Sequence, residues 1–104
     1  MQDKLLLAIG LAKRAGQAVF GTEMVRTSAK SGKAKLIIIA SDVSENTRKE
    51  ISDTASFYKT ECFASPYTMS ELSAAAGLLR STSSVAITDQ NLAVLVKNSI
   101  NTKM

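Results

Sequence analysis

The stretch Leu36-Ile37-Ile38-Ile39-Ala40 decides the fold of this 104-residue chain. Its aliphatic side chains follow one another without a polar residue, so both faces of the corresponding strand are apolar. A strand of this kind is typical of the centre of a sheet that is covered on both sides. The stretch therefore predicts an α/β protein with helices above and below a central sheet.

The sequence on both sides of this strand alternates between helical and extended periodicity. The expected elements are a helix over residues 3–14, a strand over 17–20, a helix over 21–31, the central strand over 36–40, a helix from the segment 42–45 to about residue 58, a strand over 61–64, a helix over 68–76, a strand over 84–88 and a final helix after residue 89. This order, α-β-α-β-α-β-α-β-α, predicts a three-layer α/β/α sandwich around a four-stranded mixed sheet.

Polar side chains mark the starts of three of these helices. Asp42 and Glu45 have the spacing of a capping box, and Thr68 and Glu71 repeat it. Asp89 is the predicted N-cap of the last helix. We interpret Asp42, Glu45 and Asp89 as helix caps rather than as catalytic carboxylates.

The composition excludes several classes of enzyme. The chain has no histidine and one cysteine, Cys62. A Ser-His-Asp or Cys-His device cannot form, and a zinc site lacks its usual ligands. Both standard phosphate-binding glycine motifs are missing. We therefore expect no catalytic residue, metal, cofactor or small-molecule substrate, and interpret Cys62 as a small buried apolar residue.

The start of the chain does not have the pattern of a targeting segment. Its apolar run, Leu5 to Ile9, is short and leads into Lys13 and Arg14 without a cleavage site of small residues. No stretch approaches the roughly 20 apolar residues of a membrane-spanning helix. We expect a cytoplasmic protein with one domain over residues 1–104 and no membrane partner.

The net charge of +4 lies in the first half of the chain. Residues 1–52 hold nine Lys/Arg and five Asp/Glu, whereas residues 53–104 hold four of each. Between positions 13 and 35 the chain has six basic residues and one acidic residue, Glu23. The basic residues are Lys13, Arg14, Arg26, Lys30, Lys33 and Lys35. A one-sided basic surface is typical of a protein that binds a polyanion. The alternative is that these side chains merely solvate helix faces.

Two segments are candidate RNA contacts. The turn Phe20-Gly21-Thr22 joins a strand to a helix, and a helix N-terminus offers free N–H groups to a phosphate or a base edge. The loop Gly77-Leu78-Leu79-Arg80 holds two leucines, and exposed apolar loop residues can stack on a splayed-out base. The alternatives are that Gly21 is only a turn residue and that the leucines pack under the preceding helix.

The sequence resembles the ribosomal L-seven-Ae family, and its small bacterial members most closely. The segments that carry the resemblance span nearly the whole chain: 11–16, 21–22, 31–42, 71–77 and 84–87. The resemblance implies an α/β/α sandwich that binds kink-turn RNA, a sharply bent duplex with tandem sheared G·A pairs and a bulge. In this family the helix start after the first strand contacts the G·A pairs, and the loop before the last strand contacts the bulge.

The family pattern after the first strand is Gly-x-Asn/Lys-Glu/Gln/Ser-x-x-Lys. Gly21 matches its glycine, and Thr22 the variable place that follows. Glu23, Met24 and Thr27 stand where the family has other residues, and Arg26 is a candidate substitute for the lysine. With the charge pattern, the resemblance assigns RNA contacts to Lys13, Arg14, Gly21, Thr22, Glu23, Met24, Arg26, Thr27, Lys30, Lys33, Lys35, Leu78, Leu79 and Arg80.

These observations predict a non-enzymatic RNA-binding protein whose partner is kink-turn or similarly bent RNA, ribosomal or otherwise structured, with association with the ribosome. The alternative function is a protein–protein docking module of the same fold that acts in translation. Its contact patch would be Met24, Leu78, Leu79 and Arg80. A small nucleotide-binding sandwich is a third candidate, which the missing phosphate loops disfavour.

Overall fold

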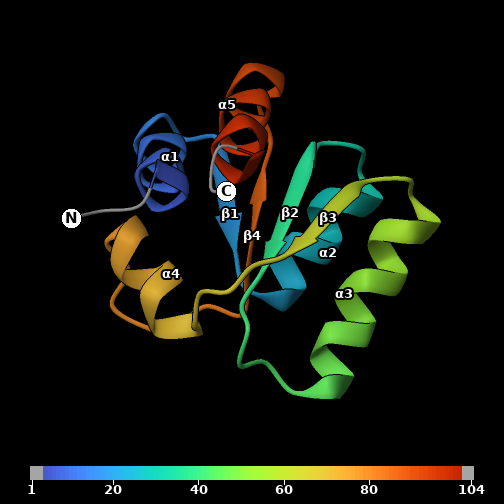
Figure 1. The fold of residues 1–104 in the computed structure, drawn as a ribbon. Coiled ribbons are helices and arrows are strands. Elements are labelled where there is room, and N and C mark those ends of the chain that lie inside the picture. The colour runs from blue at the N-terminus through green and yellow to red at the C-terminus, as the bar shows by residue number, and fades with distance from the viewer. Residues whose placement is uncertain (1–3, 102–104) are drawn as a thin grey trace.

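The computed structural model describes residues 4–101 (Figure 1). Its elements are α1 (Lys4–Arg14), β1 (Ala18–Phe20), α2 (Thr22–Lys30), β2 (Leu36–Ile39), α3 (Glu45–Phe57), β3 (Glu61–Ala64), α4 (Met69–Ala76), β4 (Ser84–Ile87) and α5 (Gln90–Asn101). The predicted order of alternating helices and strands is confirmed, and most boundaries differ by only one or two residues.

The four strands form one mixed sheet in the order β1-β4-β2-β3. β4 pairs antiparallel with both β1 and β2, and β3 pairs parallel with β2. β2 is a central strand, and all four of its residues are buried. This confirms the mixed sheet and the covered strand predicted from residues 36–40.

Helices cover both faces of the sheet, which makes the predicted three-layer sandwich (Figure 1). Alternate residues of β2 point to opposite faces, so Ile38 packs among side chains of α1, α4 and α5. Ile37 and Ile39 instead pack against Val25 of α2 and Ile51 of α3. Each face thus has its own apolar core, and the sheet holds α1 and α2 at a fixed separation.

Two of the three predicted helix caps are confirmed. Thr68 and Glu71 form a full capping box at α4, and Asp89 accepts a hydrogen bond from the backbone N–H of Leu92 at 3.0 Å. The prediction for Asp42 is wrong, because Ser44 is the N-cap of α3. The Asp42 carboxylate accepts a hydrogen bond of 2.8 Å from the N–H of Met69, at the start of α4.

Within residues 4–101, every helix is too short or too polar to cross a membrane.

Candidate nucleic-acid interface

The turn after β1 and the segment before β4 lie side by side at one end of the sheet. β1 pairs antiparallel with β4, so Phe20, at the end of β1, lies opposite Val85, near the start of β4. The backbone N–H of Gly21 donates a 3.1 Å hydrogen bond to the carbonyl of Ser84. Both regions that the sequence predicted as RNA contacts therefore meet here, and we call this the loop end of the sheet.

Gly21 occupies a backbone conformation that other residues avoid. Its φ is 93° and its ψ is 153°, a combination essentially restricted to glycine. A Cβ atom added here would meet nothing within 4 Å, so the backbone conformation, and not crowding, requires glycine. Gly21 is also the N-cap of α2 and supplies no side-chain cap. The first N–H groups of α2 are therefore without a side-chain acceptor at this residue, as an anion-binding helix start requires.

Hydroxyl groups tie the start of α2 to the segment before β4. The Oγ1 of Thr22 lies 2.8 Å from the Oγ of Ser83, and the latter lies 3.2 Å from the Oγ of Ser84. The Oγ1 of Thr82 donates a hydrogen bond of 2.9 Å to the carbonyl of Ser84. These bonds hold the loop against the helix start, so the two surfaces have a fixed relative position.

A shallow hollow of about 510 Å³ lies between these two regions. Its lining comes from the end of β1 and from the loop, namely Phe20, Gly21, Gly77, Leu78, Leu79, Arg80, Ser81 and Thr82. Leu78 packs partly against the core, whereas Leu79 is fully exposed, at 104%. Leu78 therefore packs as the alternative interpretation expected, whereas Leu79 is the apolar side chain presented to solvent.

The first turns of α2 carry the residues that depart from the family pattern. Glu23, Met24 and Thr27 are all exposed, and Met24 is 54% exposed. Among the described residues, the carboxylate of Glu23 has neither a hydrogen-bond donor nor a basic partner. It remains available as an acceptor beside the start of α2.

Most of the predicted basic contacts lie at the opposite end of the sheet. Lys13 and Arg14 form the last turn of α1 and Lys30 ends α2, while Lys33 and Lys35 lead into β2. At about 3.3 Å per residue, Lys35 is roughly 16 Å along the strand direction from Ala40, beside the loop end. We call Lys13, Arg14, Lys30, Lys33 and Lys35 the basic end.

Arg26 lies in neither group. Its Nε donates a 3.1 Å hydrogen bond to the Oγ1 of Thr54, and its Nη1 lies 3.5 Å from the Oε2 of Glu50. Both partners belong to α3, so this guanidinium is turned toward α3. The structure thus divides the predicted basic cluster between the basic end and a helix–helix contact.

The sequence analysis missed a residue at each end. Ser83 fixes the loop through Thr22, but one serine in the polar run 81–84 carries no signal of its own. Lys59 lies at the basic end because β3 runs parallel to β2 and pairs Glu61 with Leu36. Only the strand pairing reveals Lys59, since the second half of the chain has no excess of charge.

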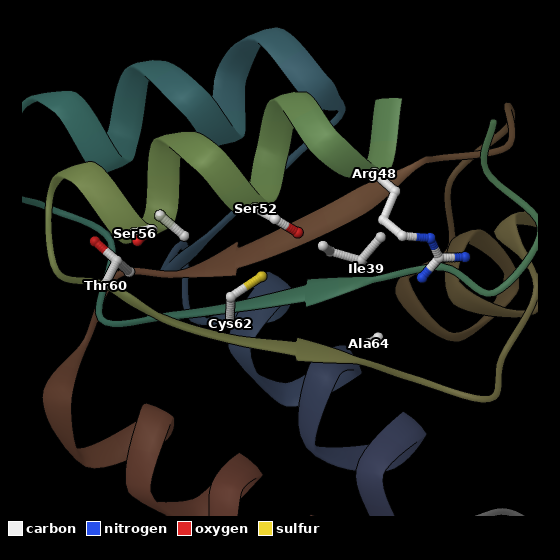
Figure 2. A pocket seen from close by; sticks show the side chains of 8 residues that line it. Ile39, Arg48, Ser52, Ser56, Thr60, Cys62 and Ala64 are labelled. Carbon is white, nitrogen blue, oxygen red and sulfur yellow. The ribbon is translucent and has the colours of Figure 1, made fainter. Parts of the chain in front are cut away.

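A second hollow, of about 330 Å³, lies between α3 and the edge strand β3 (Figure 2). Cys62 is exposed at this edge and not buried as predicted, although its sulfur points toward α3 (Figure 2). Partial burial raises the pKa of the Cys62 thiol, so the protonated form persists at neutral pH. The only charged side chain lining this hollow, Arg48, donates a 3.4 Å hydrogen bond to the carbonyl of Ser41. Nothing in the hollow activates the thiol as a nucleophile.

Within residues 4–101, no three potential acidic, cysteine or histidine ligands come together as a metal site would require.

Comparison with known proteins gives one family and several relatives. The family model described as ribosomal protein L7Ae/L30e/S12e/Gadd45 matches residues 3–96. The RNA-binding protein YlxQ of Enterococcus faecium is 40% identical over 62 residues, which are 60% of each chain. The protein of the same name from Bacillus subtilis is 34% identical over 88 residues, 82% of this chain and 83% of its own.

Solved structures share the fold. A protein of unknown function from Bacillus halodurans superposes with a TM-score of 0.87 at 25% identity, over 96% of this chain and 99% of its own. A 15.5kD RNA binding protein of Giardia lamblia superposes with a TM-score of 0.73, over 95% of this chain and 83% of its own. That protein is 17% identical and bears on the fold alone. With the family model matched over nearly the whole sequence, the chain belongs to the ribosomal protein L7Ae/L30e/S12e/Gadd45 family.

Proposed function

We propose that this chain is an RNA-binding protein that holds kink-turn or similarly bent RNA at the loop end, acting by binding and not by catalysis. Its family membership and the two bacterial relatives named as RNA-binding proteins support RNA as the partner. The proposal extends to structured ribosomal RNA and the ribosome, since the family model carries a ribosomal description.

The observation that carries this proposal is the meeting of the Gly21 turn with the Leu78–Arg80 loop around one hollow. A bent RNA presents both a phosphate backbone and unstacked bases, and single-stranded or bulged bases are where proteins read RNA sequence. The loop end offers a partner for each feature. The start of α2 has no side-chain cap for its first N–H groups, and the side chain of Leu79 is fully exposed on the loop.

Each exposed group at the loop end has a chemical role in such a complex. The first N–H groups of α2 donate to a phosphate or to a base edge. The Glu23 carboxylate accepts from the amino group of a base, and the apolar side chain of Leu79 covers the face of an extruded base. Arg80 neutralises a nearby phosphate. These groups act together because Thr22 and Ser83 fix the loop to the helix.

The direct test is a titration against a kink-turn RNA and a copy of that RNA without its G·A pairs. We expect tighter binding to the kink-turn, because the sheared pairs and the bulge create the edges and the extruded base that the loop end contacts. Equal affinity for both RNAs would remove the bent-RNA function. It would leave a basic protein that binds RNA without regard to shape.

The Leu79→Ala variant tests the place of binding. Burial of a leucine side chain is worth about 1.5–3 kcal/mol, so the affinity for the kink-turn should fall by about ten- to a hundredfold. The folding stability should not change, since Leu79 packs against nothing. The matched control is Leu95→Ala on α5, because Leu95 is also an exposed leucine, at 42%. If both variants bind as the original does, the contact is not at the loop.

The protein-docking function is favoured by the same exposure of Met24 and Leu79. The two functions differ in their dependence on salt. RNA affinity falls steeply with salt concentration because counterions are released on binding, whereas an apolar protein contact changes little. Co-sedimentation with ribosomes that survives nuclease treatment and high salt would favour the docking function.

A further inference from the structure

Six exposed basic side chains gather at the basic end of the sheet. They are the five residues of the basic end and Lys59. They come from the end of α1, the end of α2, the turn before β2 and the turn after α3. Among residues 4–101, none of the six side chains forms an ion pair or a hydrogen bond.

Strand pairing brings these residues together from distant parts of the sequence. Ala18 and Leu36 both lie opposite Ile87, so the starts of β1 and β2 flank the end of β4. The N–H of Lys35 donates a 2.7 Å hydrogen bond to the carbonyl of Ile87. On its other side, β2 pairs with the start of β3, which follows Lys59 closely. These pairings place the six basic residues along the same end of the sheet, and we call them the basic band.

The carboxylates near this band do not neutralise it. Glu61 lies 2.8 Å from the Nζ of Lys97, so a lysine outside the band already compensates its charge. Asp89 accepts a hydrogen bond from the N–H of Leu92 as the cap of α5. Glu61 and Asp89, the carboxylates next to the start of β3 and the end of β4, therefore each have another partner.

A purely structural explanation accounts for only part of the band. Lys13, Arg14 and Lys30 lie in the last turns of helices, where positive charge favours the helix dipole. Lys33 and Lys35 lie outside every helix. Their charges repel those of the other four, at a cost that a bound polyanion would reverse.

We propose that the basic end is a second RNA contact, which holds the phosphate backbone of a stem that leaves the bend bound at the loop end. This inference rests on the proposed function. α2 connects the two ends, since it begins at the loop end and Lys30 is its last residue (Figure 1). Glu23, Thr27 and Lys30 share one exposed face of α2 at helical spacing, so an RNA strand that follows this face passes from one contact to the other.

The chemistry of the two contacts differs. Lysine ammonium groups on flexible stems bind phosphates as point charges and read no sequence. The basic end therefore adds affinity for any duplex of sufficient length and contributes nothing to the choice between the kink-turn and its copy without G·A pairs. It should also account for most of the salt dependence of binding.

The test compares a short kink-turn RNA, whose stems end close to the bend, with a long version whose stems continue for about one helical turn. The full chain should bind the long RNA about tenfold more tightly and with a steeper salt dependence. The variant Lys33→Gln with Lys35→Gln should lose this advantage, and its slope of log affinity against log salt should fall by about 2. Its affinity for the short RNA and its preference for G·A pairs should be retained.

The matched control is Lys4→Gln with Lys49→Gln, which removes the same charge from exposed lysines elsewhere on α1 and α3. An equal loss of the long-RNA advantage in both variants would overturn the proposal, because the net charge of the protein would then explain that advantage without a specific site. An unchanged advantage for the long RNA in the Lys33 and Lys35 variant would overturn it as well. If the short RNA is bound without preference for G·A pairs while the long-RNA advantage still depends on Lys33 and Lys35, the loop-end function fails and the basic-end contact stands.

Discussion

The loop end and the basic end of this sheet are built in different ways. At the loop end, a glycine-specific turn, a hydroxyl chain through Thr22 and Ser83, and backbone hydrogen bonds connect the helix start to the segment before β4. Its candidate contacts carry one positive charge, on Arg80, and one negative charge, on Glu23. The basic end and Lys59 together present six positive side chains, none of which forms an ion pair or a hydrogen bond within residues 4–101. Geometry dominates at one end, and charge at the other.

This difference teaches how a small RNA-binding domain can separate specificity from affinity. Side chains held in place discriminate shapes, because a misplaced partner leaves polar groups unpaired. Flexible lysines add affinity for phosphates in any arrangement. A change at the loop end should therefore alter which RNA is bound, and a change at the basic end should alter how strongly salt weakens binding.

The largest effect in this comparison is expected from Gly21→Ala. The alanine would have to adopt a glycine-specific conformation, at a cost of about 1–3 kcal/mol, so the loop end should lose both stability and its preference for the kink-turn. Stability is measured by urea denaturation, and RNA affinity at a temperature where circular dichroism shows a folded chain.

The control for Gly21→Ala is Gly32→Ala at the other end of α2. Gly32 also has a positive φ, of 79°, and open space around its Cβ position. Its substitution should cost stability but leave the preference for G·A pairs intact. If the kink-turn preference survives Gly21→Ala, or disappears equally in Gly32→Ala, the loop end does not recognise the shape of the RNA.

A smaller effect is expected from Thr22→Val, which removes the hydroxyl that contacts Ser83. Loss of one hydrogen bond is worth about 0.5–1.5 kcal/mol. The loop should become more mobile, and the affinity for the kink-turn should fall several-fold at an unchanged salt slope. Thr47→Val serves as the control, since it likewise removes a contact between two hydroxyl groups, the one with Ser44 at the start of α3. Equal affinities of the two variants would show that the Thr22–Ser83 contact does not position the loop.

The smallest effect is expected from Arg26→Gln. The sequence placed Arg26 among the RNA contacts, but the structure turns it toward Glu50 and Thr54 of α3. Both members of this ion pair are about half exposed, and such pairs contribute about 0–1 kcal/mol. We expect a loss of stability within this range and little change in RNA affinity. If Arg26→Gln lowers the RNA affinity as much as Lys33→Gln with Lys35→Gln does, Arg26 contacts the RNA after all.

Much of the fold was predictable because local patterns and tertiary structure agree. The run Leu36–Ile39 is apolar on both faces and forms a strand covered on both sides. Asp42 shows where local patterns fail. Its spacing to Glu45 fits a capping box, but Ser44 lies closer to the helix start, and Asp42 caps α4, 27 residues away. Which of two possible caps a helix uses depends on the tertiary structure, and the spacing of residues in the sequence carries no information about it.

The binding surface was less predictable than the fold. The sequence places Gly21 and Lys33 twelve residues apart and suggests one surface. α2 lies between them, and a nine-residue helix extends about 13 Å. Gly21, before this helix, and Lys33, after it, therefore lie at opposite ends of the sheet. Gly21 and Leu79, by contrast, are distant in sequence and line one hollow. Distance along a chain and distance in space are related only through the strand pairing.

The central claim is that the two ends contribute separately to RNA binding. The most direct measurement is the affinity for one long-stemmed kink-turn RNA over a series of salt concentrations, for Leu79→Ala and for Lys33→Gln with Lys35→Gln. We predict that Leu79→Ala lowers the affinity by the same factor at every salt concentration, whereas the lysine variant lowers the slope by about 2. Identical changes of slope in the two variants would contradict the claim and indicate a single, undivided surface.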